Sequence, residues 1–241
     1  MTKRMLTSAL CAGLAAGLLA ALLHFAFIQN LILLGEQYET GQTVHFGTAA
    51  APSTEVGHDH TTPAAATAAH DHGTPPSTLW RKSLTALFTV LLYTGYGLLL
   101  VAGFALAEHF GTRITARDGV LWGGAGFIAV QLAPAMGLAP ELPGTPGAEL
   151  VLRQIWWLGT IAATATGIAL LAYGRGISVA VLGAALLAAP HVIGAPQTAQ
   201  FAGVAPPELA AAFAARVLGT SLAAWLLLGS VAGHFWTQRT T

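Results

Sequence analysis

Residues 5–29 decide the fold class: they read MLTSALCAGLAAGLLAALLHFAFIQ and contain no Asp, Glu, Lys or Arg. A helix that crosses a bilayer core about 30 Å thick needs about 20 apolar residues, because each residue rises about 1.5 Å. This stretch is therefore predicted to be a membrane-spanning helix. It is too long for the apolar core of a secretory signal, and no small-residue cleavage site follows it closely, so we expect it to be retained.

Further apolar segments approach the same length, and each is predicted to be a helix: 83–107, 119–133, 150–173, 177–189 and 209–232. The alternation typical of strands is absent, and lipid tolerates only helices or closed barrels. Segment 177–189 is short and Pro190 follows it, so it can be a kinked crossing or a re-entrant hairpin. The sequence thus predicts an all-α, polytopic helical membrane protein of about six transmembrane helices, or five if segment 177–189 is re-entrant.

The overall composition excludes several other classes of protein. Hydrophobic residues make up 54% of the chain and charged residues only 8%, against about 25% charged in a soluble domain. The charges balance at ten of each sign, without the dense basic patch that nucleic-acid binding requires. The single cysteine, Cys11, cannot form a disulfide framework.

Basic residues beside the helix ends predict the orientation, because they gather on the cytoplasmic side. With the N-terminus inside, the inner side holds Lys3, Arg4, Arg113, Arg117, Arg175 and Arg239. The outer side then holds only Arg81 and Lys82 near helix ends. We therefore expect one membrane domain over residues 1–241, both termini in the cytoplasm, and an extramembrane loop over 36–79 on the outer side.

That outer loop carries the strongest chemical signal in the chain. Between 48 and 78 it consists mainly of Ala, Pro, Thr and His, so it cannot bury a core of its own. Within it stand two triplets, His58-Asp59-His60 and His70-Asp71-His72. Imidazole binds Co²⁺, Ni²⁺, Cu²⁺ and Zn²⁺, and the Asp adds a carboxylate. We predict that the triplets capture a divalent metal, although a polar tether with incidental histidines is the alternative.

Polar residues at membrane depth are the next candidates, because they are costly there and usually face the bundle interior. His24, Glu36 and His191 all fall towards the predicted outer face and are expected to converge on a passing cation. His191 follows Pro190, where a broken helix would free carbonyl oxygens. The alternative is that each of these residues makes only one interhelical hydrogen bond.

Other polar and aromatic residues are predicted to have local roles. Glu149 and Arg153 have the i, i+4 spacing of an ion pair on one helix surface. Glu108 and His109 are predicted to line the inner mouth of an ion path. Trp236 is expected to anchor the last helix at the lipid headgroups.

Motifs of soluble or membrane enzymes are absent from the sequence. The only lysines are Lys3 and Lys82, and neither ends a phosphate-binding glycine-rich loop. There is no H-E-x-x-H helix and no G-x-S-x-G turn. We predict that the chain is not an enzyme, and that any transport uses a gradient, a coupled ion or a partner.

Residues 119–144, GVLWGGAGFIAVQLAPAMGLAPELPG, resemble the CbtA family of predicted cobalt transporter subunits. The stretches RQIWWL at 153–158 and APHVIGAP at 189–196 are similar to the same family. The resemblance implies an inner-membrane protein for cobalt uptake and a small partner, CbtB, with one membrane helix and a histidine-bearing end.

Together these features predict a permease subunit that takes up a divalent transition metal, Co²⁺ first and Ni²⁺ or Zn²⁺ next. No permanently bound cofactor is expected. The expected partners are membrane lipid and a CbtB-like subunit, with a homo-oligomer also open. The alternative hypothesis is a membrane-bound metal-binding accessory protein that does not translocate the ion.

Overall fold

The computed structural model describes residues 2–45, 78–198 and 203–238, and every regular element within them is a helix. The elements are α1 (Thr2–Leu23), the π-helix η1 (His24–Ile28), α2 (Gln29–Glu39), α3 (Thr78–His109), α4 (Ala116–Phe127), the π-helix η2 (Ile128–Leu132), α5 (Ala133–Ala135), α6 (Leu150–Tyr173), α7 (Ile177–Ile193) and α8 (Pro207–Thr237). The predicted all-α class is confirmed.

The predicted membrane segments all appear as helices. Four helical stretches are long and apolar enough to cross a bilayer: α1 through α2, α3, α6 and α8. The stretch α4–η2–α5 runs without a break, and α7 is a shorter apolar helix. The first helical stretch runs further than predicted, through Glu39, so residues 36–39 are helical rather than part of the loop.

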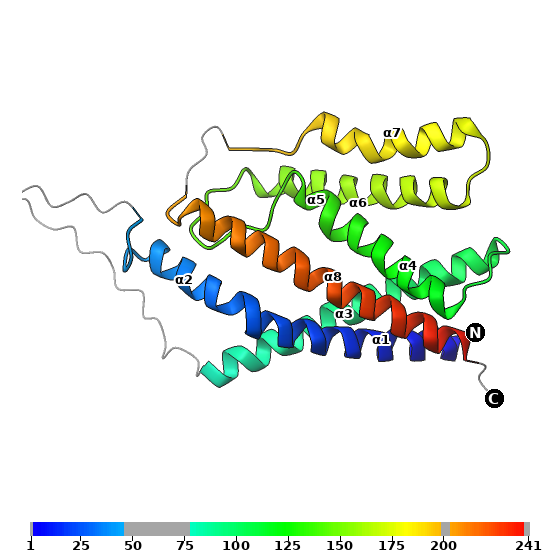
Figure 1. Ribbon diagram of the computed structural model, residues 1–241, viewed down its shortest axis with the longest axis horizontal. Helices are drawn as coiled ribbons and strands as arrows, with labels where there is room; N and C mark the ends of the chain where they lie inside the picture. The colour runs from blue at the N-terminus through cyan, green and yellow to red at the C-terminus, as the bar shows by residue number, and fades with distance from the viewer. Residues whose placement is uncertain (1, 46–77, 199–202, 239–241) are drawn as a thin grey trace, which may run out of the picture.

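The helices form an elongated bundle (Figure 1). The pair α1 and α3 lies along one side, the hairpin α6–α7 lies along the other, and α4 and α8 lie between them. The two ends of the chain lie at the same end of the bundle (Figure 1).

Leucines face outward on α1 while small residues face inward. Leu6, Leu10, Leu14, Leu18 and Leu22 recur every four residues and are 48–65% exposed. On the opposite face Ala9, Ala12 and Ala16 are fully buried. A continuous ridge of exposed leucine is unfavourable in water, so this surface fits a hydrocarbon environment.

Glycines bring neighbouring helices into backbone contact. An added Cβ at Gly17 of α1 would lie 2.6 Å from the Val90 Cα of α3. On α4 and α8, Gly119 and Gly123 face Gly229 and Gly233, and any of the four would clash with the opposite backbone if it carried a side chain. Such small-xxx-small seams allow helices to approach closely where lipid offers no hydrophobic driving force.

The third predicted segment does not stop at Pro134. The helix continues to Ala135, and the π-helix η2 precedes the proline, with the Ala133 N–H bonded to the Ile128 carbonyl. Proline has no N–H and its ring crowds the preceding turn, so an uninterrupted α-helix is unfavourable there. Widening the turn accommodates Pro134 without ending the helix, which the predicted boundary at Ala133 missed.

Segment 177–189 is part of a continuous helix rather than a re-entrant loop. α7 runs antiparallel to α6 and continues through Pro190 to Ile193, where Gly194 (φ +83°) ends it. Gly167 of α6 and Gly183 of α7 meet at their backbones. Among the described elements α7 packs only on α6. The hairpin returns the chain to the end of the bundle where α6 begins.

Candidate functional site

Arg216 of α8 contacts the π-helix η1, where the first helical stretch is locally widened. Arg216 of α8 donates from Nη1 to the Phe27 carbonyl at 3.1 Å. Phe27 belongs to η1, where the Gln29 N–H bonds to the His24 carbonyl in the wider π pattern. π-turns of this kind occur often at functional sites. Arg216 therefore links α8 to the irregular turn that contains His24.

The η1 turn lies far from the end of the bundle where α8 terminates. Arg216 precedes the last residue of α8, Thr237, by a helical distance of about 32 Å, at about 1.5 Å per residue.

The connection 136–149 covers the end of the bundle near η1. Its Leu142 is only 3% exposed and packs with Ile28 of η1 and Phe213 of α8. Arg153 of α6 holds this connection through an ion pair with Glu141 at 2.7 Å. The Gln197 side chain also donates to the Gly137 carbonyl at 2.8 Å. We call residues 136–149 the cover loop.

The predicted ion pair between Glu149 and Arg153 is wrong. Glu149 is the residue before α6, with an extended backbone (φ −51°, ψ 130°). Its side chain therefore does not follow the helical spacing that an i, i+4 pair requires. Arg153 pairs instead with Glu141, which the fold of the cover loop brings close.

The predicted metal ligands in the outer loop lie outside the described residues. These are His58, Asp59, His60, His70, Asp71 and His72, and their role stays a prediction. The described chain ends at residue 45 and resumes at 78. Glu36 of α2 and Arg81 of α3 form an ion pair at 3.9 Å. Glu36 precedes the loop by a few residues and Arg81 follows it, so this pair joins the two helices that the loop connects.

The structure does not bring His24, Glu36 and His191 together. His24 and Glu36 are on one helical stretch, separated by about 18 Å at about 1.5 Å per residue. His191 is on α7, which contacts neither η1 nor α2. Within the described ranges no group of three His, Cys, Asp or Glu residues could hold a metal ion. That each of the three residues contacts the ion at a separate position along a route stays a prediction.

The carbonyl of Pro190 is not free for a ligand. It accepts the Gly194 N–H at 3.0 Å and the Trp156 indole N–H at 3.2 Å. The helix continues past the proline, so the expected break beside His191 does not occur. His191 itself is half-buried in the last turn of α7.

A compact ionic cluster lies at the opposite end of the bundle. Arg4 of α1 pairs with Glu108 of α3 at 2.6 Å, and the Trp236 indole of α8 donates to the other Glu108 oxygen at 2.8 Å. The Arg4 guanidinium lies 3.8 Å from the centre of the Trp236 ring. Both carboxylate oxygens of Glu108 are therefore engaged, and the cluster joins three helices. It also lines an open hollow of about 550 Å³, so the role of Glu108 at an inner mouth stays a prediction.

Trp236 consequently differs from its predicted place at the headgroups. Its side chain is 1% exposed and packs edge-on against Phe104. Two charged partners, Glu108 and Arg4, outweigh the preference of tryptophan for the interface. His109, the other residue predicted at the inner mouth, lies exposed at the end of α3.

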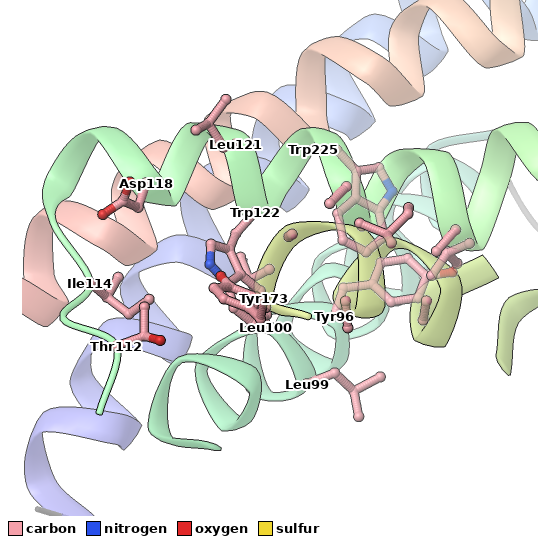
Figure 2. A pocket seen from close by; sticks show the side chains of 18 of the residues that line it. Tyr96, Leu99, Leu100, Thr112, Ile114, Asp118, Leu121, Trp122, Tyr173 and Trp225 are labelled. Carbon is pink, nitrogen blue, oxygen red and sulfur yellow. The ribbon is translucent and has the colours of Figure 1, made fainter. Parts of the chain in front are cut away.

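A cavity of about 590 Å³ lies between α3, α4, α6 and α8 (Figure 2). Its walls are mainly apolar, with Trp122 and Tyr173 facing each other at 6.3 Å between ring centres. Stacked Tyr96 and Trp225 line one end. Thr112, Arg113 and Asp118 line the other, near the ionic cluster. An apolar cavity cannot replace the hydration shell of a divalent cation.

Sequence reasoning missed Arg216 and Leu142 at the covered end, and the cavity. A signal existed for Arg216, because a lone arginine within an apolar helix needs an internal partner or the headgroups. Leu142 gave no signal, because one leucine in a Pro-rich connection is an ordinary loop residue. The cavity depends on the spacing between α3 and α6, which no local pattern encodes.

The all-helical fold, the outward leucines of α1 and the four helical stretches long enough to cross a bilayer define a polytopic helical membrane protein. Residues 2–237 match the CbtA family, described as a probable cobalt transporter subunit. The chain belongs to this family. No curated protein and no solved structure matches it.

Proposed function

We propose that this chain is the membrane-embedded subunit of an uptake system for a divalent transition metal, with Co²⁺ as the first candidate and Ni²⁺ or Zn²⁺ next. The observation that carries the proposal is membership of the CbtA family over residues 2–237. The protein sits in the inner membrane with both termini in the cytoplasm, and segment 46–77 lies on the outer side.

The first step is capture of the ion by the two His-Asp-His triplets. Imidazole ligands bind first-row divalent ions, but they favour Cu²⁺ and Zn²⁺ over Co²⁺. The triplets therefore raise the local metal concentration and do not by themselves select cobalt. Selectivity belongs to a later step or to the partner.

Glu36 is the next position on the proposed route. It precedes the point where segment 46–77 leaves the described chain, and it pairs with Arg81, which follows the point where the chain resumes. His24 follows in η1, and His191 lies on the other side of the bundle. The cover loop packs over η1 through Leu142. Passage of an ion therefore requires the cover loop to move, or a CbtB-like partner or second copy to complete the route. No phosphate-binding loop is present in the sequence, so the driving force is a gradient, a coupled ion or that partner.

A second function, a metal-binding accessory protein without transport, is favoured by one specific observation. The described residues contain no group of three metal-ligating side chains, and the large cavity is apolar. An accessory protein needs only the external triplets.

Uptake of labelled Co²⁺ into proteoliposomes, with and without a CbtB-like subunit, separates the two functions. The permease proposal requires time-dependent accumulation in at least one of the two preparations. Bound cobalt without accumulation in either one leaves only the accessory function.

A matched variant tests the role of the triplets. His58, His60, His70 and His72 are replaced by Ala, and the control replaces Thr61 and Thr62 by Ala at the same loop length. We expect reduced uptake at scarce cobalt for the histidine variant alone.

A further inference from the structure

The cavity between α3, α4, α6 and α8 opens sideways. α3 and α6 both line it, yet they do not pack against each other. Ala165 and Ala169 of α6 face this gap and are exposed, as is Leu99 of α3. In a bilayer this opening faces lipid rather than water.

The length of the cavity fits an acyl chain. On α6 its lining runs from Ile161 to Tyr173, which is about 18 Å of helix and close to the half-thickness of a bilayer core.

Arg113 and Asp118 line the mouth of the cavity with opposite charges, but only Arg113 lacks a described polar partner. Arg113 lines the mouth, is exposed, and forms no ion pair with any described residue. Asp118, the acidic residue nearby, is engaged by Thr115, which donates from its backbone N–H and its hydroxyl at 2.8 Å each. The mouth lies at the end of the bundle that holds the Arg4–Glu108 pair, since Arg4, Glu108 and Arg113 line one hollow there.

We propose that this cavity binds one anionic glycerophospholipid, with an acyl chain between α3 and α6 and the phosphate beside Arg113. The apolar walls match the chain, and the unpaired guanidinium matches the headgroup. The site does not depend on metal transport: lipid binding and cobalt uptake are separate measurements, and either can fail alone.

Native mass spectrometry of the purified full-length chain tests the site with phosphatidylglycerol and phosphatidylcholine of the same acyl chains. We expect one phosphatidylglycerol to be retained in preference to phosphatidylcholine. Arg113→Gln lowers that retention about fivefold, the effect of one basic residue near an anionic surface. The control is Arg117→Gln, which removes the same charge four residues away from a side chain that does not line the cavity. It leaves retention within about twofold, because the Arg117 side chain does not line the cavity and makes no direct contact with a bound headgroup.

A second pair of variants tests the chain-binding part. Ala169→Phe fills the cavity, whereas Ala162→Phe adds the same ring to an exposed position of α6 outside it. Loss of the retained lipid in Ala169→Phe but not in Ala162→Phe supports the proposal. Equal retention of the two lipids, or equal effects within either pair of variants, overturns it.

Discussion

The contact between α4 and α8 gives the sharpest test of the packing. In Gly229→Ala the added Cβ would lie 2.7 Å from the Gly123 Cα and closer still to the Gly119 carbonyl oxygen. Carbon atoms prefer a separation of about 3.5–4.0 Å, and both opposing groups are backbone. The helices must therefore move apart by about 1 Å, and overpacking of this kind costs about 1–3 kcal/mol.

Gly219→Ala is the matched control, because it lies on the same helix and its Cβ would meet no atom within 4 Å. Both substitutions gain about 1 kcal/mol of helix propensity, so the difference between the two variants reports the overpacking alone. We expect Gly229→Ala to be less stable than Gly219→Ala by about 1–3 kcal/mol. Unfolding in detergent by denaturant measures it. Equal stability of the two variants would refute the close approach of α4 and α8.

Three further variants test the two ends of the bundle and the loop. Arg216→Gln removes a charged donor from the Phe27 carbonyl; we expect backbone amides near η1 to exchange about fivefold faster, for a loss of about 1 kcal/mol, and unchanged exchange contradicts the assigned contact. Glu108→Ala breaks the cluster with Arg4 and Trp236 and should lower the free energy of unfolding by about 1–3 kcal/mol. Arg81→Gln breaks an exposed ion pair and should change the free energy of unfolding by less than about 0.5 kcal/mol. Equal shifts of the melting temperature in the two variants would show that the cluster does not stabilise the fold. Deletion of residues 57–73 should weaken cobalt uptake at scarce metal and leave it near normal at high metal, and total loss at every concentration would instead make the loop the translocation site.

The membrane helices could be predicted because each is encoded locally, by an apolar run long enough to cross a bilayer. The close-packed glycines Gly17, Gly119 and Gly123 could also be recognised in the sequence. Each is spaced four residues from another small residue on the same face of its helix. Pro134 indicated that the helix is irregular at this point, but the sequence did not indicate that a π-turn accommodates the proline. The turn at His24 carries no proline or glycine, so no local signal indicated it.

The pairings of charged residues were the weakest part of the prediction. Arg153 has two carboxylates within reach along the chain, and the i, i+4 rule favoured Glu149. The tertiary fold of the cover loop brings Glu141 to Arg153, so Glu141 forms the ion pair. Glu108 was likewise assigned to an ion path, because neither Arg4 nor Trp236 is near it in sequence. Contacts between residues so far apart depend on helix packing, which a single sequence does not specify.

In the proposed function, imidazole and carboxylate groups on one side of this membrane bundle bind a divalent transition metal. Isothermal titration of Co²⁺ into the purified full-length chain tests it directly, alongside the variant in which His58, His60, His70 and His72 are Ala. We expect saturable binding by the intact chain and an affinity lowered about tenfold or more in the variant, as loss of imidazole ligands requires. Absence of binding heat with Co²⁺, Ni²⁺ and Zn²⁺, or identical titrations of the two proteins, contradicts the claim.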